Sequence, residues 1–362
     1  MRIVIIGAGS FGTALATVWA KSEKGEIFLL SRRKEVVEEI NLRHRNPCLP
    51  GVKVGGKAAL FSDFVFLSDD LVVLAVPSYF LRGILEEFKL KFQNQILLGT
   101  SKGIEWDTLL FPYQLVKEVL GEVRYFHISG PAFAREIAQG KRTTNLLAGL
   151  KFEPAKELAE FLAFKSNLAL IPSDDLIGAT FAGPAKNAIA LAMGLYDFQR
   201  PAEVSRATYF IELLWEVVEM GRLLGARAET FWGPAGLGDA FLSVSPQSRS
   251  YQAGFSRFLH RFAPQWLRRR FKTPISLKDG KIIFDLSVFL KDLEYFFNLD
   301  SLNLFDSQEE NERVNEGIIS LFTLYRLSQK LGLRLPRLQE TFFAYFEGSE
   351  LAEEKIKKLL KK

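Results

Sequence analysis

Short apolar runs alternate with stretches of helical periodicity over the first half of the chain. The runs are rich in Val, Ile and Leu, which is typical of strands buried on both faces of a sheet. They lie at residues 2–6, 26–31, 71–76, 95–100 and 123–129. Between the first two, the segment 13–22 places Leu15, Val18 and Trp19 at helical spacing. This alternation predicts an α/β fold with a parallel, doubly wound sheet, whose ligands lie at the carboxyl ends of its strands.

From about Phe152 the pattern changes, and after Asp175 it is mainly helical. The predicted elements are a surface helix at 153–163, a last short strand at 168–175, a largely apolar helix at 185–195 and a long, mostly buried helix at 206–226. We therefore expect an α/β domain over residues 1–172 and an all-α domain over residues 173–362.

Three glycines follow the first strand at the spacing G-x-G-x-x-G, as Gly7, Gly9 and Gly12. Strand, glycine turn, helix and second strand form the context in which this spacing binds a dinucleotide. Gly7 permits the tight turn, Gly9 allows the backbone to approach a pyrophosphate, and Gly12 allows close packing of the helix on the strand. The free N–H groups of the helix N-terminus would then face the phosphates. An ordinary glycine-rich turn is the alternative.

The second strand ends in Ser31, Arg32 and Arg33, where NAD-specific sites usually carry an acidic residue for the ribose hydroxyls. A guanidinium suits phosphate, so Arg32 favours a site that accepts NADP. A solvated charge cluster that opens the next helix is the alternative, and the choice between NAD and NADP stays open.

Two features of the second half point to chemistry. Lys186 lies at the start of the apolar helix 185–195, and its ammonium group needs a partner or a catalytic use unless it reaches solvent from the first turn. Residues 233–254 gather glycines, serines, Asp239 and Arg249, which fits either an anion-binding loop or a plain connection between helices.

Composition and charge narrow the function classes. The net charge of +5 suits a phosphorylated small molecule or a negatively charged surface without requiring either. Cys48 is the single cysteine, which excludes an internal disulfide and fits a reducing compartment. The three histidines are scattered, so no metal site is expected. We see no signal-peptide pattern and no apolar run long enough to span a bilayer, and we expect a cytoplasmic protein.

Seven motifs carry a resemblance to a known family. In chain order they are GAGSFGTALA, NLRHRNPCLPG, SKGIE, GPAFARE, GPAKNAIALAMG, GLGDAFLSVSPQSRS and NEG. On these motifs, which span nearly the whole chain, the protein resembles the bacterial-type NAD(P)-dependent glycerol-3-phosphate dehydrogenases. The resemblance implies hydride transfer between dihydroxyacetone phosphate and sn-glycerol 3-phosphate, with the product supplying phospholipid synthesis. It also implies a Rossmann-type first domain, a second domain like the C-terminal domain of 6-phosphogluconate dehydrogenase, and a homodimer.

The resemblance also implies roles for single residues. Lys186 matches the proton donor and acceptor at the substrate C2 oxygen, Lys102 matches the second active-site lysine, and Asp239 matches the family's aspartate. The implied substrate-binding positions are Lys102, Gly130, Ala132, Asn187, Ser248, Arg249 and Ser250. The implied cofactor positions are Gly7, Gly9, Ser10, Phe11, Gly12, Arg32, Lys102, Ala134, Arg249, Val314 and Glu316.

The chain departs from the family pattern at four positions near the implied substrate site. Ala132 stands in place of serine, Val204 and Ser250 in place of asparagine, and Glu212 in place of arginine. These changes keep two other functions open, a dehydrogenase for another keto or hydroxy compound and a dinucleotide-binding protein without catalysis. The presence of both active-site lysines argues against the second.

An extra segment at about 255–310 is longer than the connection that the family needs there. It interleaves aromatic and basic residues and then becomes hydrophobic and acidic. A basic amphipathic helix can lie on a membrane surface, while a helical subdomain or a dimer contact is the more ordinary interpretation. We expect no nucleic-acid partner, because no recognition module accompanies the basic residues.

Overall fold

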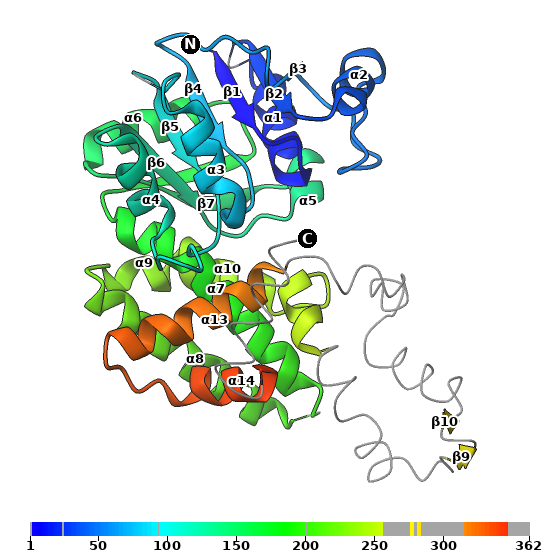
Figure 1. Cartoon of the computed structure of the whole chain (residues 1–362), viewed down its shortest axis with the longest axis vertical. Coiled ribbons are helices and arrows are strands. Elements are labelled where there is room, and N and C mark those ends of the chain that lie inside the picture. The colour runs from blue at the N-terminus through cyan, green and yellow to red at the C-terminus, as the bar shows by residue number, and fades with distance from the viewer. Residues whose placement is uncertain are drawn as a thin grey trace. The chain divides into compact units, whose positions relative to one another are not determined.

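The computed structural model divides the chain into two compact units (Figure 1). It describes residues 2–23, 25–92, 94–199, 201–255, 276–278, 281–283 and 315–346. The first unit comprises Met1–Lys186 and Val217–Ala240, and the second comprises Asn187–Glu216 and Phe241–Lys362. The predicted boundary at residue 172 rests on the sequence pattern, whereas these units are defined by contacts between residues. The boundary therefore stays a prediction.

An eight-stranded sheet forms the centre of the first unit, with strand order β3-β2-β1-β4-β5-β6-β7-β8. Its strands are β1 (Ile3–Ile6), β2 (Ile27–Ser31), β3 (Lys57–Leu60), β4 (Leu71–Leu74), β5 (Ile96–Gly99), β6 (Arg124–Ser129), β7 (Thr143–Gly149) and β8 (Leu168–Ser173). Every residue of β1 and β4 is buried, which explains their unbroken apolar runs. The predicted α/β fold is confirmed.

One strand pair differs from the expected parallel arrangement. Strands β6 and β7 are antiparallel, and the other pairs of this sheet are parallel. The sequence interpretation did not identify β3 or β7, because neither presents an unbroken apolar run. Thr143, Thr144 and Asn145 open β7 with polar side chains, which hides the strand.

The helices of the first unit pack against the sheet or against one another. They are α1 (Ser10–Lys21), α2 (Lys34–Arg43), α3 (Ser78–Phe88), α4 (Pro112–Leu120), α5 (Ala134–Ala138), α6 (Phe152–Ala163), α9 (Ala228–Trp232) and the π-helical turn η1 (Pro234–Gly238). Helices α1 and α6 contribute Leu15, Trp19 and Leu158 to a core shared with Ile3 and Ile5 of β1. This core fixes the glycine turn at the carboxyl end of β1.

The second unit is helical over most of its described residues. Its elements are the end of α7 (Leu176–Asp197), most of α8 (Glu203–Leu223), α10 (Asp239–Ser243) after its first two residues, a helical stretch over 249–255, α13 (Glu316–Lys330) and α14 (Pro336–Phe346). A two-stranded ladder joins β9 (Ser276–Lys278) and β10 (Lys281–Ile283). The rest of the predicted extra segment lies outside the described residues.

Helix α7 crosses the helical stretch 249–255 with the two backbones in contact. A Cβ on Gly194 would clash with the carbonyl oxygen of Tyr251, and a Cβ on Gly254 would clash with that of Leu191. Both helices therefore need glycine at the crossing, because any side chain would force them apart.

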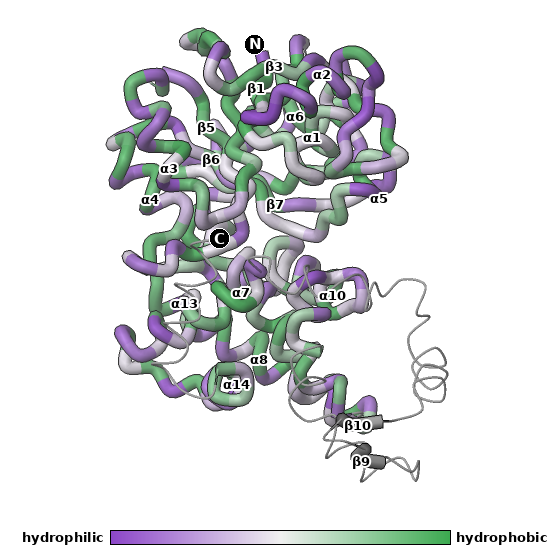
Figure 2. The backbone as a smooth tube through the Cα atoms, turned by 45° about the vertical axis from the view of Figure 1, so that its right-hand side comes forward, coloured by the Kyte–Doolittle hydropathy of each residue, from purple (hydrophilic) through white to green (hydrophobic). Residues whose placement is uncertain are grey.

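Three expectations about these helices need correction. Helix α7, whose hydropathy is coloured in Figure 2, is long and apolar enough to cross a membrane by length and composition, contrary to the expectation that no run is. However, 89% of its apolar window is buried inside the protein. Helix α8 is mostly buried only in its second half, because its first turns face solvent. The predicted loop at 233–254 is largely helical and contains η1 and α10, since its glycines close a π-helical turn.

Candidate functional site

The glycine turn between β1 and α1 has the geometry of a nucleotide-binding turn. Gly7 has a positive φ of 115°, and a Cβ there would clash with the carbonyl oxygen of Ala75. A Cβ on Gly12 would clash with the carbonyl oxygen of Gly7, so the helix packs closely on the end of the strand. A Cβ on Gly9 would meet none of the described atoms within 4 Å. Open space therefore lies in front of the α1 N-terminus, where a pyrophosphate would need it.

The loop after α2 holds this turn in place. Ser10 in the first turn of α1 donates from Oγ to the carbonyl oxygen of Cys48 at 2.5 Å. The amide of Asn46 donates to the carbonyl oxygen of Ala8 at 3.0 Å, and it is buried. Phe11, the other predicted cofactor residue here, packs against the core of the sheet. The sequence interpretation missed Asn46, although it quoted the motif that contains it.

Arg32 lies directly after β2 and has two neighbours. Its Nη2 is 2.7 Å from Oε2 of Glu87 on α3, and its guanidinium carbon is 5.3 Å from the ring centroid of Phe61. The side chain is 64% exposed. Arg32 is therefore both paired and accessible, so the alternative of a solvated charge cluster stays open.

Lys102 lies in the loop after β5 and reaches two oxygen atoms. Its Nζ donates to the carbonyl oxygen of Gly130 at 2.9 Å and to Oδ2 of Asp239 at 2.5 Å. Gly130 follows β6, the neighbour of β5 in the sheet. The two residues thus meet at the carboxyl ends of adjacent parallel strands, which is where α/β sheets bind ligands.

Lys186 completes a cluster with these residues. Its Nζ lies 3.3 Å from Oδ1 of Asp239, and its side chain is only 13% exposed. Asp239 is buried, with a side chain 1% exposed, so each of its carboxylate oxygens faces one ammonium group. Lys186 does not extend to solvent, and the structure brings together Lys102, Lys186 and Asp239 as one charge cluster.

Two local features position the cluster. On α7, a Cβ on Gly183 would come within 2.9 Å of the Cβ of Lys102, so glycine permits the helix to approach the lysine stem. The turn η1 ends immediately before Asp239, and the N–H of Gly238 donates to the carbonyl oxygen of Gly233 at 3.2 Å. π-Helical turns often occur at functional sites, because the extra residue redirects the next side chain.

An anchor formed by Arg82 and Glu105 holds the loop of Lys102. Arg82 on α3 donates from Nε and Nη2 to the two carboxylate oxygens of Glu105, each at 2.8 Å, and from Nη2 to Glu118 at 2.8 Å. Burial acts to raise the pKa of Glu105, but hydrogen bonds from Arg82 and Thr108 outweigh it, so this pKa is lowered. Glu105 therefore stays ionised and keeps its ion pair with Arg82. The sequence interpretation missed this role of Arg82.

A buried histidine lies beneath the site. His127 on β6 is fully buried, and its Nδ1 is 2.9 Å from the hydroxyl of Tyr125. Among the described residues, its Nε2 has no hydrogen-bond partner. Burial, together with the nearby charge of Lys102, lowers the pKa of His127 to about 3. This imidazole therefore stays neutral, and nothing in the sequence pattern pointed to it.

The turn after β6 carries two further predicted residues. Ala132 and Ala134 both pack against the hydrophobic core of the sheet, and Ala134 opens the short helix α5. The carbonyl oxygen of Pro131 accepts a hydrogen bond from the hydroxyl of Thr143 on β7. The turn is thus tied to the antiparallel strand that follows it.

The remaining predicted site residues belong to the second unit. Ser248 and Ser250 are buried and Arg249 is exposed, while Asn187 is buried in α7. The amide of Asn315 donates to the carbonyl oxygen of Arg249 at 3.0 Å, next to Glu316 at the N-terminus of α13. Within this unit the structure brings together Ser250, Arg249 and Glu316. Val314 lies outside the described residues.

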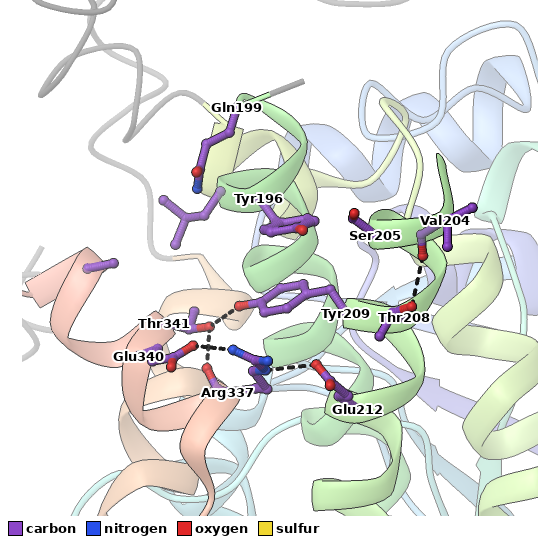
Figure 3. A pocket seen from close by; sticks show the side chains of 12 residues that line it. Tyr196, Gln199, Val204, Ser205, Thr208, Tyr209, Glu212, Arg337, Glu340 and Thr341 are labelled. Carbon is purple, nitrogen blue, oxygen red and sulfur yellow. Dashed lines mark hydrogen bonds and ion pairs between the residues drawn. The ribbon is translucent and has the colours of Figure 1, made fainter. Parts of the chain in front are cut away.

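A pocket of about 390 Å³ in the second unit holds two of the departures from the family pattern (Figure 3). Its lining includes Val204 and Glu212 of α8, and Arg337 of α14. Arg337 donates from Nε to Oε2 of Glu212 at 2.8 Å and from Nη1 to Oε2 of Glu340 at 2.9 Å. Glu212 therefore shares the guanidinium of Arg337 with Glu340 inside this pocket.

Two family profiles match the chain. The profile described as "NAD-dependent glycerol-3-phosphate dehydrogenase N-terminus" matches residues 2–153, and the one described as "NAD-dependent glycerol-3-phosphate dehydrogenase C-terminus" matches residues 175–261.

Individual proteins show the same similarity. A glycerol-3-phosphate dehydrogenase (NAD(P)+) of Carboxydothermus hydrogenoformans is 31% identical over 355 residues, which cover 96% of this chain and 93% of the relative. One of Thiobacillus denitrificans is 35% identical over 259 residues, which cover 70% and 78%. A crystal structure of glycerol-3-phosphate dehydrogenase from Coxiella burnetii aligns with a TM-score of 0.74 at 24% identity, covering 100% of this chain and 99% of the other. That structure has the same fold.

Proposed function

The chain belongs to the family of NAD-dependent glycerol-3-phosphate dehydrogenases, and we propose that its Lys102–Asp239–Lys186 cluster performs the chemistry of that family. The reaction interconverts dihydroxyacetone phosphate and sn-glycerol 3-phosphate with NAD or NADP. The observation that carries the assignment of the site is one buried carboxylate bound to two lysine ammonium groups, at 2.5 Å and 3.3 Å.

The first unit fits a dinucleotide cofactor. The open space at Gly9 and the positive φ of Gly7 form a backbone cradle that a side chain would fill or distort. Gly7, Gly9, Ser10, Phe11 and Gly12 would hold the pyrophosphate region, and Arg32 would face the adenosine ribose. When bound, the nicotinamide cofactor supplies or accepts the hydride.

The two lysines can stabilise charge on the ketone oxygen and supply its proton. Negative charge develops on the C2 oxygen as the carbonyl is reduced, and a preorganised ammonium group stabilises it. Lys186 donates the proton to that oxygen, and in the reverse direction it accepts the proton. Lys102 adds a second positive charge and holds the substrate. The cluster has two positive charges and one negative charge, so it favours an anionic substrate.

Asp239 keeps the two ammonium groups in place. Without its carboxylate the lysines would repel one another in a poorly solvated site. Each oxygen takes one lysine, so the carboxylate fixes both Nζ atoms. Asp239 is therefore a positioning residue for the proton donor.

Arg249 and the buried serines beside it support binding of the substrate phosphate. A guanidinium binds phosphate by charge-assisted hydrogen bonds, and holding the phosphate orients the carbonyl carbon for reaction. The ion pair with Arg337 offsets part of the negative charge of Glu212, which limits the repulsion that this residue would exert on a phosphate. From the family resemblance we also propose a homodimer whose product supplies phospholipid synthesis. From the composition and motifs of the sequence we propose a cytoplasmic location and no nucleic-acid partner.

An oxidation assay tests the function. NADH and NADPH oxidation is followed by absorbance with dihydroxyacetone phosphate, and unphosphorylated dihydroxyacetone is the matched control. We expect oxidation with the phosphorylated ketone and little with the control, because only the former engages Arg249. Equal rates on both ketones would contradict the substrate assignment, and no oxidation on either would contradict the activity.

A further inference from the structure

The carboxyl end of β2 carries the group that would distinguish the two cofactors. NADP differs from NAD by a phosphate on the adenosine 2′-oxygen, and an arginine after this strand can accommodate that phosphate. Arg32 occupies this place, 64% exposed, directly after a strand whose residues are mostly buried. The preference of the protein therefore depends on what else holds the Arg32 guanidinium.

Glu87 holds it from a neighbouring element. Its Oε2 accepts from Nη2 of Arg32 at 2.7 Å, and its side chain is 47% exposed. It lies on α3, between β4 and β5, far from Arg32 in sequence. In NAD-specific sites an acidic residue follows the second strand, whereas here the carboxylate, that of Glu87, comes from helix α3.

Aromatic packing keeps Glu87 within reach of Arg32. The N–H of Phe61 donates to the carbonyl oxygen of Ser31 at 3.0 Å, which fixes Phe61 beside the end of β2. Its ring lies beneath the guanidinium and also contacts the ring of Phe88 edge to face, with centroids 4.1 Å apart. Phe88 follows Glu87 directly in α3, so the same ring positions both members of the ion pair.

The pair is weak enough for a ligand to break. Exposed ion pairs contribute little to stability, since both groups are well hydrated when apart. A 2′-phosphate would compete with Glu87 for the guanidinium and would also meet the charge of that carboxylate. A 2′-hydroxyl carries no charge, so NAD leaves the pair intact.

We infer that Glu87 is a specificity-determining residue, which competes for Arg32 and thereby lowers the affinity for NADP relative to NAD. The inference rests on the proposed function for the identity of the cofactors. It adds to the proposed role of Arg32, because the preference between NAD and NADP then depends on the Arg32–Glu87 ion pair and not on the arginine alone.

Calorimetric titration of the full-length protein with NADP+ and NAD+ tests this without turnover. In Glu87→Gln we expect about fivefold tighter NADP+ binding and unchanged NAD+ binding, because loss of the carboxylate frees Arg32 and removes repulsion. Glu26→Gln is the matched control. It removes an exposed carboxylate that pairs with Lys57 at 3.0 Å, at the other end of the same strand pair. The control should leave the ratio of the two affinities unchanged.

The route through Arg32 is tested in a second background. In Arg32→Gln, the further change Glu87→Gln should no longer tighten NADP+ binding by the same factor. Three results would overturn the inference. The ratio of NADP+ to NAD+ affinity could stay unchanged in Glu87→Gln, or both affinities could shift equally. Glu87→Gln could also tighten NADP+ binding by the full factor in the Arg32→Gln background. Ketone-dependent NADH oxidation by the wild type is measured in parallel, so a failure of the proposed activity is seen separately from a failure at Glu87.

Discussion

Replacing Asp239 by asparagine tests the charge cluster most directly. The change keeps the shape of the side chain and removes its negative charge. One of the two lysine contacts can survive as a hydrogen bond to the amide oxygen, while the amide nitrogen would face the other ammonium group. The cluster then holds two positive charges with no counterion.

The size of the effect follows from burial. Removing one partner of a buried ion pair costs roughly 3–5 kcal/mol. The lysine side chains keep 21% and 13% of their exposure, so water compensates in part. We therefore expect a loss of about 3 kcal/mol in unfolding free energy. Displacement of the proton donor by about 1 Å should lower kcat by about 100-fold.

The assay combines kinetics with binding and stability. kcat and KM are measured for dihydroxyacetone phosphate, NAD+ affinity by calorimetry, and stability by urea unfolding. NAD+ affinity should change much less than kcat, because Asp239 contacts only Lys102 among the implied cofactor positions that the structure describes and does not contact the glycine turn. Asp175→Asn is the matched control, since Asp175 is a buried carboxylate of the same unit that accepts from the N–H groups of Gly178 and Arg227. It should lose stability and keep kcat.

A folded Asp239→Asn protein with wild-type kcat would refute the assigned role. Loss of kcat in Asp175→Asn equal to that in Asp239→Asn would also refute it, because the effect would then come from stability alone.

Three further predictions follow from the same contacts. Lys186→Ala should abolish turnover and leave NAD+ affinity nearly intact, and wild-type-like turnover would remove Lys186 from the mechanism. Arg82→Lys should lower kcat about tenfold without changing NAD+ affinity, because a lysine cannot reproduce the two-pronged contact with Glu105 that holds the Lys102 loop. A change in NAD+ affinity alone would contradict that positioning role. The pKa of His127 is about 3 in the folded protein and about 6.5 in an unfolded chain. Above pH 6.5 the imidazole is neutral in both states, and its titration costs no stability. Below pH 6.5 the unfolded chain binds a proton that the folded protein does not, so the unfolding free energy should fall by about 1.4 kcal/mol per pH unit. Urea unfolding at pH 7.5 and 5.0 should show a smaller difference for His127→Gln, and an equal difference would exclude the histidine as the cause.

The sequence predicted the parts of the fold whose cause is local. Mainly apolar runs identified β1, β2, β4, β5 and β6, because strands buried on both faces carry few polar residues. Strand β7 escaped because it begins with polar residues and pairs antiparallel, which depends on its neighbour rather than on its own pattern. The stretch 233–254 was expected as a loop because glycine is a poor helix former, but a π-helical turn uses its glycines for backbone contact.

The candidate site shows the same division. Resemblance supplied Lys102, Lys186 and Asp239, and the structure brings these three together, although their separation in sequence gave no sign of it. Arg82 and Glu87 could not have been found from spacing, because each acts through a partner on another element. The sequence does not distinguish a charged residue on the surface of an amphipathic helix that has a partner on another element from one that has none.

The antiparallel pairing of β6 with β7 has a consequence for the order of folding. Parallel neighbours in this sheet meet only after a helical crossover has closed, whereas β6 and β7 are joined by the short segment between Ser129 and Thr143. Contacts between residues close in sequence cost less chain entropy to form and tend to form early. The carbonyl of Gly130 lies in that segment, so a folding chain can assemble this acceptor before β5, which precedes the loop of Lys102, has docked beside it.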